Sequence, residues 1–364
     1  NLSMNIFNHI HGQIIDLLQL YPADAKAKIV VEPPKDASHG DISTNAAMVL
    51  SKAAGKNPKE LAETFKSLFK QIDCVEEISI AGPGFINFKL KTDFIQKQVA
   101  AINMLAASYG DSDFGQNEKV NLEFVSANPT GPMHIGHARG AVFGDVLGNI
   151  LAKAGYDVTR EYYINDAGGQ IETLKKSLQL RIDGVAEIPA GYYPGEYLIE
   201  VAAKTKNVDK AVAIIMEDYI KPDLAAAGIK FDKFVSEYHE VQGAGKVDAA
   251  LKTLQDKGLI YVGVLEAPKG KVPDDYEARE QTLFKSTLFG DDVDRAIKKS
   301  DGSYTYFAGD LGYHLTKVER GFTRLINVWG VDHGGYVKRI KAGVDALSDK
   351  KVTLDVKLCA LVKV

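Results

Sequence analysis

The stretch KVNLEFVSANPTGPMHIGHARG, residues 119–140, decides how the chain is expected to fold. Its first nine residues are mostly apolar, as in a buried strand of a parallel sheet. A turn rich in glycine and proline follows, and a helix is expected from about His134 to Ala154, with Gly155 as its C′ residue. The next run, DVTREYYIND at 157–166, predicts a second strand. Strand, turn, helix and strand with short connections make a βαβ unit.

Alternation of strand and helix returns near the end of the chain. Strands are expected at SYTYFA (303–308), RLINVWG (324–330) and LDVKLCALVKV (354–364), with helices at 310–320 and 336–347. The part between the two alternating regions, about 168–300, is mainly helical by pattern. The expected fold class is therefore α/β, with one parallel sheet over 116–364 interrupted by a helical insertion.

The first hundred or so residues predict a smaller α/β domain, expected to cover 4–108. Helices are expected at 4–20, 43–54, 58–69 and 94–106, and EEISIAGPGFINFKL (76–90) predicts two strands around a Gly-Pro-Gly turn. Pro58 suits the first turn of a helix. The stretch 109–119 has the composition of a linker.

Composition narrows the class of protein. The 364 residues are 45% hydrophobic and 25% charged, and the net charge of −4 excludes a chain that is polybasic as a whole. Cys74 and Cys359 are the two cysteines, which excludes a disulfide framework and a cysteine zinc site. We find no signal-peptide pattern and no apolar run near the ~20 residues of a membrane span. We expect a cytoplasmic protein without membrane contact.

The turn at 126–133 lies where open parallel sheets bind ligands, beyond the carboxyl end of a strand. The helix that follows offers free N–H groups and a positive dipole end, which suit phosphate. Gly131 and Gly136 let a ligand approach the backbone closely. His134 and His137 share one face of the first turn, where two imidazoles can donate to phosphate oxygens. Two solvated or packed imidazoles at a helix start are the ordinary alternative.

The string ANPTGPMHIGHARG (127–140) contains the letters H-I-G-H in the context that marks class I aminoacyl-tRNA synthetases, and it resembles arginyl-tRNA synthetases of the bacterial type. ASHGDISTNAAM (37–48) and GPGFINF (82–88) resemble the N-terminal add-on domain of that family. Four further stretches resemble consecutive blocks of its catalytic domain: REYYINDAGGQ (160–170), FDKFVSE (231–237), LFKSTLFGDDVDRAIKKSDGSYTYFAGDLGYH (283–314) and WGVDHGGYV (329–337).

The resemblance implies a Rossmann-like catalytic core, ATP-dependent activation of L-arginine to arginyl-adenylate, and transfer to tRNA(Arg) in translation. Mg²⁺ would accompany ATP, without a dedicated protein site. The family pattern continues into a lysine loop of the KMSKS type and a helical anticodon-binding domain. This chain ends before both, so we expect the anticodon-binding domain to be absent. We expect the activity of these 364 residues to depend on whether the reaction needs the two missing parts. We expect a monomer.

By resemblance, Glu237, Tyr306 and Asp310 match the positions that hold the guanidinium of arginine. A guanidinium is a planar, permanently charged fork, and carboxylates that accept bidentate bonds select it. The ordinary alternatives are a surface acid for Glu237, a core aromatic for Tyr306, and a helix N-cap or first-turn acid for Asp310. Only the resemblance favours the functional interpretation.

Other residues are expected around arginine and ATP. Ser126 and Asn128 could hold the α-amino group of arginine or cap the local turn, and Tyr313 could form a wall of the pocket or pack in the core. Gly330, Asp332 and His333 could contact adenine and ribose, or form a plain turn with an aspartate N-cap. The expected ATP-binding residues of the first turn are Pro129, Gly131, His134, Gly136 and His137, of which His134 and His137 are the expected catalytic residues.

Two other classes of function stay open from the residues alone. A small-molecule nucleotidyltransferase can share the histidine-containing turn, but it needs neither the N-terminal domain nor the paired acids. A synthetase-like protein that only binds RNA or a partner is the other class, because the lysine loop is missing from this chain. Five lysines of the N-terminal helices could contact tRNA or lie on a solvated face: Lys52, Lys56, Lys59, Lys66 and Lys70.

Overall fold

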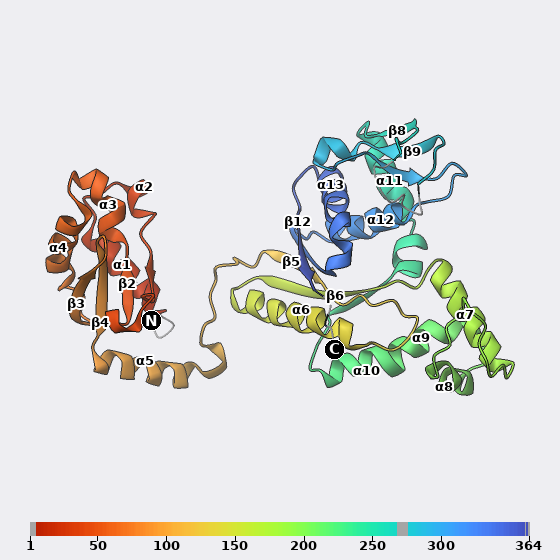
Figure 1. The fold of residues 1–364 in the computed structure, drawn as a ribbon, viewed down its shortest axis with the longest axis horizontal. Helices are drawn as coiled ribbons and strands as arrows, with labels where there is room; N and C mark the ends of the chain where they lie inside the picture. Colours follow the sequence, from red (N-terminus) through yellow and green to blue (C-terminus); the bar gives the residue numbers. More distant parts are fainter. Residues whose placement is uncertain (1–4, 268–275, 361, 363–364) are drawn as a thin grey trace. The chain divides into compact units, whose positions relative to one another are not determined.

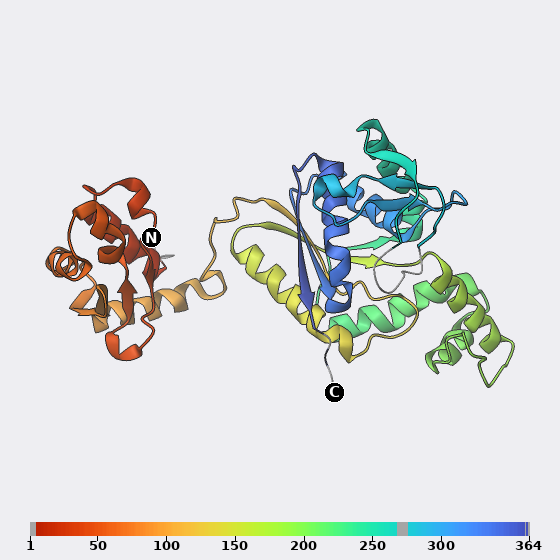
Figure 2. The same ribbon diagram turned by 45° about the horizontal axis from the view of Figure 1, so that its top comes forward.

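The chain is described by a computed structural model that covers residues 5–267, 276–360 and 362, and it divides into two compact units after Asp111. Figure 1 shows both units, and Figure 2 shows them turned by 45°. Among the described residues, no helix is long and apolar enough to span a membrane.

The N-terminal unit contains an antiparallel sheet of strand order β1-β2-β4-β3 with helices packed against it. Its strands are β1 (Val31–Glu32), β2 (Ile42–Thr44), β3 (Val75–Ala81) and β4 (Phe85–Leu90). Its helices are α1 (Ile6–Leu17), α2 (Ala23–Lys26), α3 (Ala46–Ala54), α4 (Pro58–Phe69) and α5 (Thr92–Leu105), with 3-10 turns at Ala37–His39 and Ala106–Ser108.

Local signals predict most of this unit correctly. The helix predicted at 58–69 is α4, which Asn57 caps by accepting from the Lys59 N–H, with Pro58 in the first turn. The helix predicted from Ser43 is wrong in its first residues, because Ser43 and Thr44 belong to β2 and pair with β4. Pairing with a neighbouring strand satisfies their backbone groups, and no local pattern reveals that partner.

The C-terminal unit is built on a parallel sheet of order β12-β11-β5-β6-β7, which confirms the predicted α/β class. The strands are β5 (Lys119–Glu123), β6 (Asp157–Ile164), β7 (Lys233–Ser236), β11 (Arg324–Gly330) and β12 (Thr353–Cys359). Leu325 packs into the hydrophobic cluster on one face of the sheet, and Ile326 into the cluster on the other. Because both faces are covered, these strands bury apolar residues on either side, and they also bury the polar side chains of Asn121, Glu123, Glu161 and Asn327.

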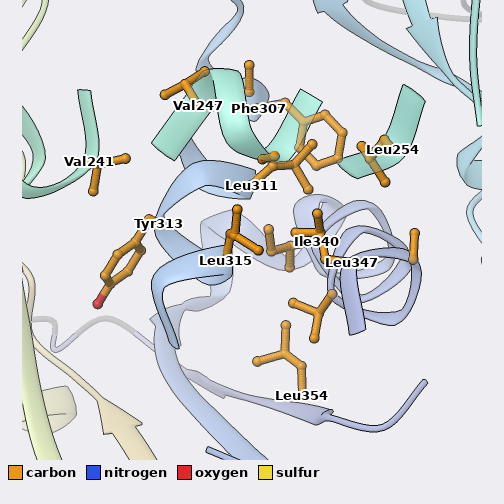
Figure 3. Close-up of a cluster of buried hydrophobic side chains, with 14 of the residues drawn as sticks. Val241, Val247, Leu254, Phe307, Leu311, Tyr313, Leu315, Ile340, Leu347 and Leu354 are labelled. Atoms are coloured by element: carbon orange, nitrogen blue, oxygen red, sulfur yellow. The ribbon is translucent and has the colours of Figure 1, made fainter. Parts of the chain in front are cut away.

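Helices cover the two faces of this sheet (Figures 1 and 2). On one side lies α6 (Ile135–Lys153), and on the other lie α12 (Tyr306–Glu319) and α13 (Val337–Ser348) with α11 (Lys246–Asp256) beside them. Leu311 and Leu315 of α12 meet Ile340 and Leu347 of α13 in a buried hydrophobic cluster that also contains Leu354 of β12 (Figure 3). This packing fixes α12 on the sheet.

The middle of the chain holds the remaining elements. Its helices are α7 (Gly169–Ile182), α8 (Tyr197–Lys204), α9 (Ala211–Ile215) and α10 (Lys221–Ala226), with π-helical turns at Met216–Ile220 and Glu237–Gln242 and 3-10 turns at Val208–Lys210 and Ser286–Phe289. It also contains β7 of the parallel sheet and an antiparallel sheet of β8 (Ile260–Gly263), β9 (Gln281–Phe284) and β10 (Arg295–Lys298). The segment 168–300 is therefore not one helical excursion from the sheet.

The strand predicted at 303–308 is wrong. Tyr304 makes only an isolated bridge with Lys298, and α12 begins at Tyr306. Thr305 is the N-cap, and its hydroxyl accepts from the Ala308 N–H at 3.3 Å. The predicted strand 324–330 is β11, and the helix predicted at 336–347 is α13. The last predicted strand ends at Cys359, and three of its residues, 361, 363 and 364, lie outside the described part of the chain.

Candidate active site at the carboxyl edge of the parallel sheet

The two histidines form the N-terminus of α6. The Nδ1 of His134 accepts from the Gly136 N–H at 3.1 Å, and the Nδ1 of His137 accepts from the His134 N–H at 3.2 Å. Their ring centroids are 4.1 Å apart. Because each Nδ1 accepts, the neutral rings carry their protons on Nε2, which is then a donor. Burial and the neighbouring His134 lower the pKa of His137, which favours this neutral donor form.

The turn between β5 and α6 is strained and is held by Ser126. Val125 and Ser126 have φ of +66° and +43°, which side chains other than glycine rarely adopt. The Ser126 hydroxyl donates to Glu123 Oε1 at 3.2 Å and accepts from the Tyr163 N–H at 3.1 Å. This serine therefore fastens the turn to the next strand of the sheet.

Asn128 lies exposed on the same turn. Its amide nitrogen donates to Gln170 Oε1 at 2.9 Å, and its oxygen accepts from Asn165 Nδ2 at 3.0 Å. Pro129 is buried behind it. A Cβ at Gly131 would lie 3.2 Å from the ring of Tyr197, so a side chain there would crowd the turn. The turn is thus shaped by packing on one side and open at Asn128 on the other.

Glu237 and Asp310 lie beside each other although 73 residues separate them in the sequence. Glu237 directly follows β7, and its Oε1 accepts from Gln242 Nε2 at 2.9 Å. The same oxygen lies 3.7 Å from the position of a Cβ at Gly309, the residue before Asp310. Asp310 Oδ2 accepts from the Tyr336 hydroxyl at 2.6 Å. Both acids are partly buried.

Burial and neighbouring acids disfavour the ionisation of both carboxyl groups. Burial raises the pKa of Asp310 to about 7, and the charges of Glu123 and Glu237 act in the same direction. Burial also raises the pKa of Glu237, with a contribution from Asp166. Within the described ranges, neither acid forms an ion pair with lysine, arginine or histidine. Strongly shifted, adjacent carboxyl groups of this kind are typical of binding sites for cations.

The two tyrosines expected at the arginine pocket occupy opposite environments. Tyr306 is 81% exposed in the first turn of α12, so the core-aromatic alternative for it is wrong. Tyr313 is 2% exposed, its ring stacks on Tyr163 at 4.0 Å, and its hydroxyl donates to Glu161 Oε1 at 2.7 Å. Figure 3 shows that hydroxyl pointing away from the aliphatic cluster. Tyr313 therefore packs inside the unit, and its hydroxyl is already bonded.

The turn after β11 projects its polar side chains into solvent. Gly330 ends the strand, and Asp332 and His333 are exposed, with 3.5 Å between Asp332 Oδ2 and His333 Nε2. A Cβ at Gly330 would meet Asp332 Oδ1, so a side chain there would displace the exposed Asp332 carboxylate. Asp332 makes no side-chain cap to the 3-10 helix Val331–Tyr336, η7, so the N-cap alternative is wrong.

Three residues that the sequence pattern did not single out hold the acids in place. Tyr336 bonds Asp310, and the Tyr163 hydroxyl lowers the pKa of Glu237 by hydrogen bonding. Asp166 accepts from Ser236 Oγ at 2.6 Å and from the Tyr238 N–H at 2.8 Å, which fixes the turn that carries Glu237. All three lie in the sequence blocks quoted above, and Asp166 could have been found because it lies two residues after the end of a strand of the sheet. In the part of the chain that the structure describes, no three His, Cys, Asp or Glu side chains gather as metal ligands.

Comparison with known proteins identifies the family. A family model described as "Arginyl tRNA synthetase N terminal domain" matches residues 5–90, and one described as "tRNA synthetases class I (R), catalytic domain" matches residues 98–189. The arginine–tRNA ligase of Ruegeria pomeroyi is 50% identical over 99% of this chain and 67% of that protein. The arginine–tRNA ligase of Parvibaculum lavamentivorans is 49% identical with the same coverage.

A solved structure matches nearly the whole chain. The arginyl-tRNA synthetase of Thermus thermophilus superposes with a TM-score of 0.67 over 98% of this chain and 66% of that one, at 18% identity, which is evidence about the fold alone. The chain spans about two thirds of the length of its relatives. The close relatives, the two family models and this shared fold agree, and the chain therefore belongs to the arginine–tRNA ligases, the arginyl-tRNA synthetases of class I.

Proposed function

We propose that this arginine–tRNA ligase, which charges tRNA with arginine for translation, selects arginine through the pair Glu237 and Asp310. The observation that carries the proposal is that these adjacent carboxyl groups have raised pKa values and no cation of the described chain between them. A bound guanidinium supplies the missing positive charge, and its fork of N–H donors matches the oxygens of two carboxylates.

The remaining pocket residues have separate roles in this proposal. Tyr306 covers the guanidinium from the exposed first turn of α12. Asn128 binds the α-amino group, since its oxygen keeps a second lone pair beyond the bond from Asn165. Ser126 holds the turn in its strained form, and Tyr313 supports the pocket through its stacking on Tyr163.

ATP would lie on the N-terminus of α6, between the turn that follows β5 and the turn that follows β11. The Nε2–H groups of His134 and His137 donate to its phosphates, and Pro129, Gly131 and Gly136 shape the backbone beneath them. Gly330, Asp332 and His333 contact the adenosine. Mg²⁺ would accompany ATP and would offset the charge of its phosphates, without ligands supplied by this pocket.

The reaction then needs positioning and electrostatics rather than a covalent enzyme intermediate. The arginine carboxylate attacks the α-phosphorus of ATP, pyrophosphate leaves, and arginyl-adenylate remains bound. The terminal adenosine of tRNA(Arg) then accepts the arginyl group through its 2′-hydroxyl and AMP leaves. The two imidazoles stabilise the charge that develops on the phosphates in the first step. We propose that the chain does this as a cytoplasmic monomer, with the N-terminal unit contacting the tRNA.

Calorimetric titration with L-arginine and with citrulline tests the pocket. Citrulline has nearly the same shape but no charge, so we expect its affinity to be lower by a factor of about 100 or more. Asp310→Asn should abolish that preference. Glu319→Gln, the same kind of charge change on the far end of α12, should leave it unchanged. Equal binding of both ligands by the unaltered chain would contradict the proposal.

The histidines are tested separately from the pocket. His137→Ala should lower the rate of adenylate formation by about 10²-fold, because one preorganised donor to the phosphates is lost. Its affinity for arginine should stay unchanged, and His9→Ala, in the N-terminal unit, serves as the control. A normal rate in His137→Ala would remove this histidine from the mechanism.

A further inference from the structure

Tyr336 ties together two elements that carry different parts of the site. It is the last residue of η7, which also carries Asp332 and His333 of the proposed adenosine contact, and its hydroxyl donates to Asp310 Oδ2 on α12 at 2.6 Å. Its ring is held from three directions, by the guanidinium of Arg339 at 4.6 Å and by the rings of Phe307 and Trp329, each at 6.2 Å. The hydroxyl is therefore fixed in direction as well as in distance.

The surroundings of Asp310 otherwise oppose its ionisation. Glu123 of β5 and Glu237 after β7 face it with negative charge, and Tyr163 of β6 lies against the same group of acids. On its own helix, His314 donates from Nδ1 to the Asp310 carbonyl oxygen at 2.8 Å, with Nε2 accepting from Asn327. Burial lowers the pKa of His314 to about 3, so this imidazole stays neutral and offers no compensating charge.

Two groups act in the opposite direction. Tyr336 donates its hydrogen bond to the ionised carboxylate, and Arg339 on α13 contributes a positive charge from beyond ion-pair distance. Among the described residues, Tyr336 provides the one side-chain hydrogen bond to the Asp310 carboxyl group. Because Oδ2 is held in this way, Oδ1 and the second lone pair of Oδ2 keep a fixed orientation toward an incoming ligand.

We infer that Tyr336 is a positioning residue for amino-acid recognition: its hydroxyl keeps the Asp310 carboxylate ionised and oriented so that it can accept the guanidinium of arginine. The inference rests on the proposed role of Asp310. If the inference holds, loss of the Tyr336 hydroxyl weakens the binding of arginine and leaves the fold intact.

The test is the pH dependence of arginine affinity, measured by calorimetry between about pH 6 and about pH 9. In the unaltered chain the affinity should rise with pH, with a midpoint near pH 7 where Asp310 is half ionised. Tyr336→Phe keeps the ring and loses the hydrogen bond, so the midpoint should move up by about one pH unit. Near pH 6.5 the affinity should then be about tenfold weaker, while near pH 9 it should return to within about threefold.

Two further variants complete the comparison. Tyr261→Phe also removes a tyrosine-to-aspartate bond, from the Tyr261 hydroxyl to Asp294 Oδ2 at 2.9 Å, but it lies in the antiparallel sheet and should leave the midpoint unchanged. Arg339→Met keeps the hydroxyl and removes the cation over its ring, so the midpoint should move in the same direction by a smaller amount. This variant also replaces Tyr336→Phe as the test if that chain does not fold.

The outcomes separate the inference from the function on which it rests. If Asp310→Asn binds arginine as well as the unaltered chain, the proposed pocket is wrong. If Asp310→Asn binds poorly but Tyr336→Phe weakens binding equally at every pH, Tyr336 has only a structural role. An unmoved midpoint in both Tyr336→Phe and Arg339→Met likewise overturns the inference.

Discussion

Two pairs of carboxylates in the C-terminal unit differ in whether cations of the described chain neutralise them. Glu123 of β5 and Glu161 of β6 are buried, and each has a cation: Lys317 Nζ lies 2.6 Å from Glu123, and Arg320 lies 2.6 Å from Glu161. Burial opposes the charge of Glu161, but the bonds from Arg320 and the charge of Lys317 still hold its pKa below the ordinary value. These acids are neutralised within the chain.

The pair Glu237 and Asp310 lies at the open end of the same helix and has no such cation among the described residues. Asp310, His314 and Lys317 follow one another at spacings of four and three on α12, which places them on one face. This face is acidic at its N-terminal end and cationic further along, in the sense that the helix dipole favours. The chain thus pairs Glu123 and Glu161 with its own cations, and the other pair is the one that the proposed function assigns to the charge of the substrate.

The largest effect is expected from breaking a balanced pair. Lys317→Met leaves Glu123 buried without a cation, which should lower the free energy of unfolding by about 3–5 kcal/mol. Urea denaturation followed by the fluorescence of Trp329, the one tryptophan, reports on this unit. Adding Glu123→Gln to Lys317→Met should recover most of the loss. A loss under about 1 kcal/mol would mean that the pair is not electrostatically essential.

Removing an acid that has no cation partner should raise the free energy of unfolding instead of lowering it. The pKa of Asp310 is about 7 in the folded chain against an ordinary value of 3.8, so the folded state holds an extra proton between these values. Its contribution to the free energy of unfolding therefore falls as the pH rises from about 4 to about 7. Asp310→Asn removes this loss and should be more stable near pH 8 by about 1–2 kcal/mol, a value reduced for partial exposure to water.

The same variant should bind arginine about 100-fold more weakly, so stability and function move apart. Denaturation in urea near pH 5 and near pH 8 gives the comparison with the unaltered chain. An identical pH dependence of unfolding in the two chains would show that ionising Asp310 costs the folded chain no stability. The two pairs of acids would then not differ in their electrostatic cost.

The sequence predicted the fold best where the signal is local. The unit β5–α6–β6 follows from the apolar residues of its two strands and the glycine- and proline-rich turn after the first, and β11 has the predicted bounds. The start of α12 was mispredicted because the β-favouring residues of SYTYFA are overridden by the cap at Thr305. Strands β8 to β10 have four residues each, too few for a period of two to stand out.

The candidate site was predictable only in part, because its charges are balanced over long distances in sequence. The histidine pair could be found from its turn, but the cation of Glu123 comes from 194 residues further along the chain. No local pattern reveals such a partner, so balanced and unbalanced acids look alike in the sequence. Tyr306 and Tyr313 likewise differ only in exposure, which the tertiary packing decides.

Tyr313→Phe tests the same comparison by removing an uncharged hydrogen-bond donor to Glu161. The hydroxyl donates to Glu161 at 2.7 Å, and its loss should cost about 1.5–3 kcal/mol because the acceptor is charged. Arginine affinity should stay within about twofold, since the hydroxyl is bonded inside the unit. If the affinity falls instead while the stability is unchanged, Tyr313 is a wall of the pocket and not a packing residue.

The smallest effect is expected from an ion pair of the same chemistry that is exposed to water. Lys246 Nζ lies 2.7 Å from Glu319 Oε2 at the C-terminal end of α12, with side-chain exposures of 30% and 43%. Glu319→Gln should change the free energy of unfolding by about 0.5 kcal/mol or less, because water already solvates both charges. That difference should vanish in about 1 M salt, because the Debye length in solvent shrinks to about 3 Å. The cost of Lys317→Met should persist, because salt screens a buried ion pair much less. If the two pairs respond to salt in the same way, burial does not distinguish them, and the argument that the chain treats its deep acids differently from those at the site fails.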